Sequence, residues 1–128
     1  MAKVTVKPAA EVQGIRFGAK REAVRKAFGP NYREFKKTYF SKNTADDYGS
    51  FHVFYDKDDR MVAVEFFEGE VIVRGKTVLP AKLPSVHSAI KNLHEDGGGY
   101  VSYDESVGVS VNGDAVESIL FGCKGYYG

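Results

Sequence analysis

Asn112-Gly113 separates two β-rich segments, 107–111 and 115–121, and such a dipeptide in that position is the strongest hairpin signal in this chain. Two more pairs of short apolar segments joined by turn residues predict hairpins: 51–55 with 61–67 across Asp56-Lys57-Asp58-Asp59, and 70–79 around Arg74-Gly75-Lys76. The chain also has fourteen glycines and no tryptophan among its 128 residues. We therefore expect many short antiparallel strands joined by tight turns.

Two segments show helical spacing of apolar residues. Residues 19–28 place Val24, Ala27 and Phe28 on one stripe, and Gly29-Pro30 follows as a stop signal. Pro84 and Ser85 open a second predicted helix, which we expect to end before Gly97-Gly98-Gly99. Its apolar stripe is formed by Val86, Ala89, Ile90 and Leu93.

These elements predict an α+β fold, an antiparallel sheet with two helices packed on one face. Residues 62–69 and 116–122 resemble each other, so the fold could consist of two degenerate helix–strand repeats. Three further expectations concern the N-terminal half. Val4 and Val6 predict an edge strand that ends at Pro8, residues 35–40 predict a strand, and the polar segment 41–49 predicts a loop.

The chain is expected to be a single domain over residues 1–128, the commonest domain size. It lacks an apolar run of the roughly 18–20 residues that a membrane-spanning helix needs, and its first residues do not form a signal peptide, so we expect no membrane partner. Cys123 is the only cysteine, which favours the cytoplasm. A formal charge of +1 argues against a general binder of duplex DNA.

The charges are distributed unevenly. Residues 20–42 carry eight Lys or Arg against Glu22 and Glu34. Residues 44–70 carry eight acids against Lys57 and Arg60, and residues 92–121 carry six acids and no Lys or Arg. Like charges in one stretch repel each other, so the basic segment predicts either a well-solvated surface or a site for an anion.

The basic segment also contains aromatic rings, on which a nucleobase could stack, and hydroxyl and amide groups that could bind phosphate. The candidate ligand-binding residues are Arg21, Arg25, Arg33, Lys36, Tyr39, Ser41, Lys42, Asn43 and Thr44. The alternative is a solvated helix face whose charges pair with the acids of residues 46–70.

No catalytic motif, metal-ligand pattern or phosphate loop is present in the sequence, so we expect a non-enzymatic protein without cofactor or metal. Glu65 and Glu117 occupy matching places in the two similar segments and could be catalytic carboxylates of a hydrolase. His52 alternates with apolar residues and is expected to be half buried, whereas His87 and His94 are expected on the second helix.

Residues 14–29, in which Gly14-Ile15-Arg16-Phe17-Gly18 leads into a charged helix closed by Gly29, resemble the repeat opening of the β-lactamase-inhibitor-protein fold. They are also similar to the repeat opening of the small outer-membrane assembly lipoproteins. Those families consist of binding proteins without catalytic activity, so the resemblance implies a binding role. The chain lacks the paired cysteines of the secreted inhibitors and a lipoprotein signal.

The sequence therefore predicts a small non-enzymatic binding protein that sequesters an anionic, nucleotide-like signalling ligand, as an anti-defence inhibitor in bacterial or phage conflict would. One alternative is an immunity-type protein that binds and inhibits a toxin or enzyme, since charge asymmetry and tyrosines are typical of interfaces. A second alternative is the hydrolase. Exposed sheet edges also make a homodimer an expectation.

Overall fold

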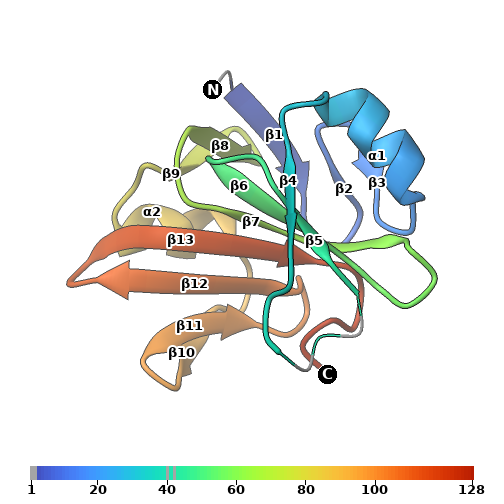
Figure 1. Ribbon diagram of the computed structural model, residues 1–128. Coiled ribbons are helices and arrows are strands. Elements are labelled where there is room, and N and C mark those ends of the chain that lie inside the picture. Colours follow the sequence, from blue (N-terminus) through green and yellow to red (C-terminus); the bar gives the residue numbers. More distant parts are fainter. Residues whose placement is uncertain (1–2, 40, 42) are drawn as a thin grey trace.

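A computed structural model describes residues 3–39, 41 and 43–128 (Figure 1). Lys42, one of the predicted ligand-binding residues, lies outside the described residues. Within the described residues the chain forms two helices and thirteen strands, and most strand pairs are antiparallel. The predicted α+β class is therefore confirmed.

The larger sheet has eight strands, and every pair of neighbours in it is antiparallel. In spatial order its strands are β10 (His94–Asp96), β11 (Gly99–Ser102), β12 (Val107–Asn112), β13 (Ala115–Gly122), β7 (Met61–Phe66), β6 (Phe51–Tyr55), β5 (Ala45–Asp47) and β4 (Arg33–Phe35).

The smaller sheet has five strands. In spatial order these are β3 (Ile15–Arg16), β2 (Glu11–Val12), β1 (Lys3–Lys7), β8 (Glu70–Val73) and β9 (Lys76–Leu79). β1 pairs with β8 in parallel, Val4 opposite Val71, and with β2 in antiparallel. The prediction that β1 is an edge strand was therefore wrong. β2 follows β1 directly in the chain, whereas β8 comes from residues 70–73, and the alternation within β1 reveals neither neighbour.

The three predicted hairpins are confirmed as β6–β7, β8–β9 and β12–β13. Each turn has a local cause. Asp56 Oδ1 accepts hydrogen bonds from the backbone N–H groups of Asp58 and Arg60, which shapes the first turn. In the other two turns Gly75 and Gly113 adopt φ of 77° and 66°, values that glycine reaches at little cost.

Helix α1 spans Arg21–Phe28 and ends at Gly29, whose φ of 99° and N–H bond to the Arg25 carbonyl close it. Helix α2 spans only Leu83–Ala89. Ile90 and Leu93 are nevertheless buried. The predicted apolar stripe thus identified the buried residues correctly but overestimated the length of the helix.

The segment after α2 was predicted incorrectly. His94 belongs to strand β10 and not to the helix, and Gly97-Gly98 forms the turn between β10 and β11. Both glycines have positive φ. The predicted loop 41–49 contains β5, because its polar residues pair with β4 and β6 and with arginines of α1. The strand predicted over 35–40 corresponds to β4, which lies earlier in the chain.

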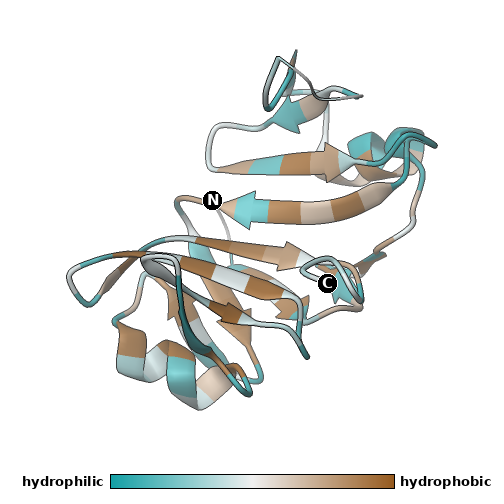
Figure 2. Ribbon diagram, turned by 90° about the horizontal axis from the view of Figure 1, so that it is seen from below, coloured by the Kyte–Doolittle hydropathy of each residue, from teal (hydrophilic) through white to brown (hydrophobic). Residues whose placement is uncertain are grey.

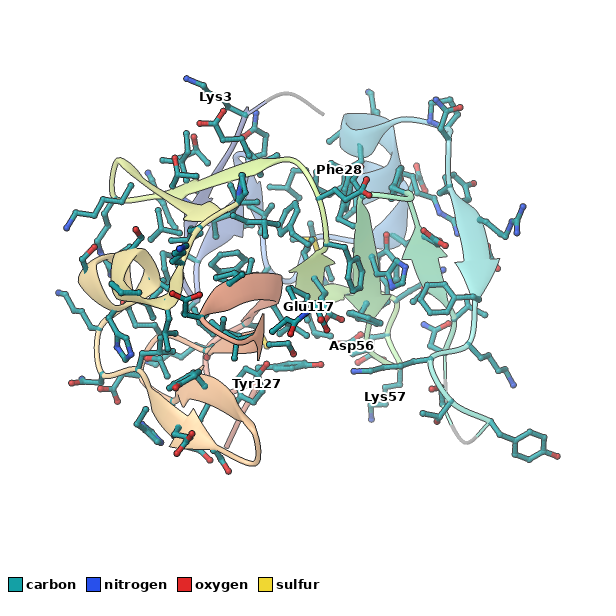
Figure 3. All side chains as sticks on the ribbon, turned by 90° about the vertical axis from the view of Figure 1, so that its left-hand side faces the viewer. Lys3, Phe28, Asp56, Lys57, Glu117 and Tyr127 are labelled. Carbon is teal, nitrogen blue, oxygen red and sulfur yellow. The ribbon has the colours of Figure 1, made fainter. Side chains whose placement is uncertain are left out.

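The main core combines buried residues of both sheets with the apolar residues of α2, and Phe28 of α1, labelled in Figure 3, packs against it. Phe28 of α1 packs against Phe51 of the larger sheet, with ring centroids 5.0 Å apart. Hydrophobic and hydrophilic residues alternate along many strands (Figure 2), as expected for sheets with one buried face. Ile119 and Phe121 of β13 point into this core.

We call the opposite side of the eight-stranded sheet the outer face. It bears Leu120, which alternates with Ile119 and Phe121, and Glu65, which is directly opposite Leu120 in the register. A second, smaller apolar cluster lies on this face. It comprises Ala45, Phe54, Ala63 and Leu120, with Tyr126 and Tyr127 of the C-terminal segment packed on it.

Candidate functional site

Arg21, the first candidate ligand-binding residue, is buried and fully engaged within the protein. Its Nε donates to Asp59 Oδ1 at 2.8 Å, and its Nη2 donates to the Thr44 carbonyl at 2.8 Å and to Asn43 Oδ1 at 3.1 Å. Its Nη1 donates to Thr44 Oγ1, and its guanidinium lies 4.0 Å from the centroid of the Tyr55 ring. Arg21 therefore joins α1 to β5 and to the β6–β7 turn.

Arg25 is engaged in the same way, one helical turn further on. Its Nε and Nη2 donate to the two carboxylate oxygens of Asp46, and Nη2 also donates to Glu34 Oε1 at 2.7 Å. The hydrogen bond with Asp46 raises the pKa of Arg25 above its usual value. The guanidinium also stacks on Tyr32, 4.0 Å from the ring centroid.

Asp46 is the centre of this arrangement and is completely buried. It also accepts a hydrogen bond from Tyr55 Oη at 2.9 Å. Burial, together with that bond, raises the pKa of Tyr55. Burial opposes ionisation of Asp59, but the bond from Asn43 and the charge of Arg21 outweigh it and lower the Asp59 pKa. We call Arg21, Arg25, Asp46, Asp59 and Tyr55 the internal ion network.

The remaining predicted ligand residues are divided between the network and the surface. Asn43 donates from Nδ2 to the Asp56 carbonyl and to Asp59 Oδ1, so its side chain supports the network. Arg33, Lys36 and Tyr39 are exposed. Ser41, Asn43 and Thr44 line a pocket of about 250 Å³, together with Lys37 and Lys57. The structure thus brings three predicted residues to one cavity and holds the two arginines elsewhere.

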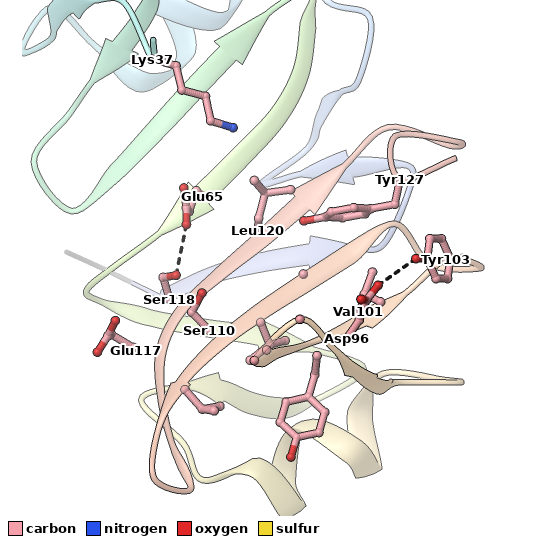
Figure 4. Close-up of a pocket in the computed structure, with 17 residues that line it drawn as sticks. Lys37, Glu65, Asp96, Val101, Tyr103, Ser110, Glu117, Ser118, Leu120 and Tyr127 are labelled. Atoms are coloured by element: carbon pink, nitrogen blue, oxygen red, sulfur yellow. Dashed lines mark hydrogen bonds between the residues drawn. The ribbon is translucent and has the colours of Figure 1, made fainter.

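A larger pocket, of about 750 Å³, lies on the outer face of the eight-stranded sheet (Figure 4). We call it the outer-face pocket. Strands β12, β13 and β7 and the β10–β11 hairpin contribute its walls, and Lys37 lies across from them. Apolar side chains such as Leu120 and polar ones such as Ser110 and Ser118 both line it.

Glycines on the outer face make room for the C-terminal tyrosines. A Cβ at Gly108 would lie 2.0 Å from Tyr127 Oη, and a Cβ at Gly122 would lie 2.5 Å from the Tyr126 ring. The tyrosines can therefore rest directly on the backbone, and Tyr127 becomes a wall of the pocket. Burial is the main cause that raises the pKa of Tyr127 to about 12. The negative charges of ionised Tyr126 and of Glu65 contribute in the same direction.

The outer-face pocket is acidic. Glu65, Asp96 and Glu117 line it, against the one cation Lys37 among the described lining residues. Glu65 accepts a hydrogen bond from Ser118 Oγ at 3.1 Å, and Asp96 accepts one from Tyr103 Oη at 2.9 Å (Figure 4). Within the part of the chain that the structure describes, none of the three carboxylates forms an ion pair.

An aromatic group adjoins the pocket on the same face. The ring of His52, opposite Glu65 in the register, lies 4.7 Å from the rings of Phe35 and Phe67. His52 is half buried, as predicted, and its Nε2 is 3.4 Å from Asp47 Oδ1. Residues 3–39, 41 and 43–128 contain no group of three or more acidic, histidine or cysteine side chains suited to a metal ion.

Sequence reasoning did not find the outer-face pocket as a site. Its residues come from segments far apart in the chain, from Lys37 to Tyr127. One signal was available, namely the stretch 92–121, which holds six acids and no Lys or Arg. Glu65 and Glu117, the two proposed hydrolase carboxylates, both line this pocket.

No protein-family model, no curated protein and no solved structure matches this chain. In the described residues, neither helix has the length and apolar character that crossing a membrane requires.

Proposed function

We propose that this chain is a small non-enzymatic binding protein that inhibits a protein partner, in the manner of an immunity protein, and that it docks through the outer face of the eight-stranded sheet. The observation that carries the proposal is the outer-face pocket, whose carboxylates have no ion-pair partner in the described residues. Unneutralised charge around a cavity attracts and orients a partner of opposite sign.

Exposed aromatic side chains near the pocket support a protein partner. Tyr103, which lines the pocket, is 48% exposed, and Phe67, next to His52, is 37% exposed. Aromatic residues are enriched at protein interfaces because each supplies a large contact area with few rotatable bonds. The resemblance of residues 14–29 to the β-lactamase-inhibitor-protein fold favours the same role.

The test uses the proteins encoded next to this chain as candidate partners, with binding measured by co-purification and calorimetry. Phe67→Ala and Tyr103→Ala should each weaken binding by about tenfold or more, the loss expected for an interface residue of moderate importance. Glu22→Ala, on the exposed surface of α1, is the matched control and should change affinity less than about twofold. Equal affinities for all three variants would contradict docking through the outer face.

A second candidate function is the capture of an anionic, nucleotide-like ligand. The pocket of about 250 Å³ favours it, because Lys37, Lys57 and Ser41 lie there beside the rings of Phe54 and Tyr126. We rank it second because Arg21 and Arg25 are engaged in the internal ion network. A thermal-shift screen against cyclic and ADP-ribose-type nucleotides tests it, and stabilisation that disappears in Lys57→Ala would support it.

The hydrolase alternative depends on Glu65 and Glu117, which line one pocket. A hydrolytic activity that survives in the double variant Glu65→Gln, Glu117→Gln would exclude it. The two-repeat organisation, the packing of both helices on one face and the homodimer also remain proposals. Sedimentation analysis of the purified protein tests the homodimer.

A further inference from the structure

We propose that the outer-face pocket binds a cationic side chain, the guanidinium of an arginine or the ammonium of a lysine, presented by the partner protein. This inference rests on the proposed function and specifies the chemistry of the partner. It is opposite in sign to the ligand that the basic segment of the sequence suggested.

The distribution of unpaired charge is the first argument. The two arginines that dominated the sequence pattern, Arg21 and Arg25, are neutralised inside the protein by Asp46, Asp59 and Glu34. Among the six acids of residues 92–121, Glu105 alone forms an ion pair within the described residues, and its partner is Arg74. The strongest uncompensated charge beside a cavity is therefore negative.

The walls of the pocket supply the second argument. A basic side chain has a long aliphatic stem and a charged tip, and it binds best where apolar surface leads to carboxylates. Leu120, Val101 and the ring of Tyr127 supply apolar lining, and Glu65, Asp96 and Glu117 supply acceptors. A volume of about 750 Å³ lies within the range of roughly 300–1,000 Å³ usual for binding pockets.

Tyr127 adds a third contact. Its ring forms a wall of the pocket, and a cation above a tyrosine ring is attracted by the negative face of the ring. Its Oη makes no hydrogen bond to another residue of the described chain, and Figure 4 shows it directed toward Leu120. The hydroxyl can therefore accept a hydrogen bond from an incoming N–H group.

Lys37 provides an internal test of sign. Its Nζ lies 4.6 Å from the centroid of the Phe54 ring, and the residue lines both the outer-face pocket and the smaller pocket. A cationic ligand in the outer-face pocket is repelled by Lys37, so Lys37→Gln should strengthen its binding. The same substitution should instead weaken the binding of an anionic ligand in the smaller pocket.

The experiment titrates the whole protein with an acetylated, amidated tetra-arginine peptide, followed by ¹H–¹⁵N NMR. The control peptide contains citrulline, which replaces each guanidinium by an uncharged urea of nearly the same shape. We expect shift changes at Ser110, Ser118 and Leu120, and an affinity for the arginine peptide at least about tenfold above that for citrulline. Raising the salt concentration should weaken the arginine complex.

Matched variants locate the interaction. The triple variant Glu65→Gln, Asp96→Asn, Glu117→Gln removes the negative charges of the pocket. It should lower the affinity for the arginine peptide by about tenfold or more. Neutralising three exposed carboxylates outside the pocket with Glu22→Gln, Asp58→Asn and Glu68→Gln changes the net charge equally and should have less than about a threefold effect. Circular dichroism melting checks that both triple variants fold.

Equal binding of the two peptides, equal loss in the two triple variants, or shift changes confined to other surfaces would overturn the inference. The proposed function fails separately. A partner protein could bind the outer face with an affinity that does not change when the pocket is neutralised. In that case the proposed function stands, and the inference that the pocket binds a cationic side chain is wrong. If the arginine peptide occupies the pocket while Phe67→Ala and Tyr103→Ala leave partner binding intact, the chemistry of the pocket stands and the docking face is wrong.

Discussion

Arg25 meets the buried carboxylate of Asp46 with two parallel hydrogen bonds, Nε to Oδ2 at 2.9 Å and Nη2 to Oδ1 at 2.7 Å. A two-point contact of this kind fixes the relative orientation of both groups. Because Asp46 is also bonded by Tyr55 and lies near Arg21, its charge is removed from water and balanced within the protein. The two arginines thus stabilise the packing of α1 on β5.

Asp46→Asn should lower the free energy of unfolding by about 3 kcal/mol, because removing one partner of a buried ion pair leaves the other uncompensated. Urea denaturation followed by circular dichroism measures the change. Asp47→Asn, the adjacent and partly exposed position, is the control and should cost less than about 1 kcal/mol. Equal costs at the two positions would show that the internal ion network does not stabilise the fold.

Gly108→Ala should displace Tyr127, because the new Cβ would lie 2.0 Å from Tyr127 Oη. We expect a cost of about 1–3 kcal/mol for the overpacking. In a Tyr127→Ala background the same substitution should be nearly neutral, and this double-mutant cycle separates the clash from a local effect on the strand. Additive costs would contradict the contact.

The same substitution should change the ionisation of Tyr127. Burial raises the pKa of this tyrosine to about 12 in the wild type, so its phenol stays protonated after exposed tyrosines have ionised. The burial of neutral Tyr127 stabilises the fold at any pH below the pKa of this tyrosine in the unfolded chain. That contribution is lost as the pH rises toward 12. In Gly108→Ala, absorbance titration at alkaline pH should show one additional tyrosine ionising at about pH 10, the ordinary pKa of a tyrosine.

The sequence predicted the elements whose cause is local. Asn112-Gly113 and Arg74-Gly75 determine turns through residues next to each other, and both hairpins are confirmed. The partners of Arg21 are not local, since Asp59 lies 38 positions away. A basic helix face and an arginine bound to buried acids look alike in sequence. Of the two predictions for the basic segment, the structure therefore matches the pairing of the helix charges with acids of residues 46–70, although Arg21 is buried and not solvated.

The C-terminal half shows why apolar spacing predicted burial better than helix length. Ile90 and Leu93 continue the stripe of Val86 and Ala89, but the chain leaves the helix at Ile90, where φ is −109°. Both residues reach the core from extended or turn backbone. The outer-face pocket escaped prediction for a related reason, since strand order brings Glu65 beside β13 and no local pattern records that order.

Leu93→Ala should therefore destabilise the protein as a core substitution, by about 2–4 kcal/mol, although Leu93 lies outside the helix. The cost comes from lost apolar burial and from the cavity that remains. Lys91→Ala, two residues earlier and exposed, is the control and should cost less than about 0.5 kcal/mol. Thermal unfolding of the two variants distinguishes a buried stripe from a solvated connector.

The last prediction concerns acid stability and the pair Arg74–Glu105. The side-chain hydrogen bonds from Arg74 lower the pKa of Glu105, and the bond from the Lys91 N–H lowers it further. Burial of Glu105 acts in the opposite direction but is outweighed. A carboxylate whose folded pKa is depressed stabilises the fold above its unfolded pKa, about 4.3, and that contribution is lost as pH falls through the folded value.

Glu105→Gln should therefore lower the free energy of unfolding at pH 7 by about 2 kcal/mol, the cost of losing hydrogen bonds to a charged group. It should also flatten the loss of stability below about pH 4, because the titrating group is gone. Arg74 additionally donates to the Ala89 carbonyl at the end of α2, so the variant should loosen that helix terminus first. Urea midpoints between pH 3 and pH 7 measure both effects, and a pH profile parallel to that of the wild type would show that Glu105 is not the group responsible.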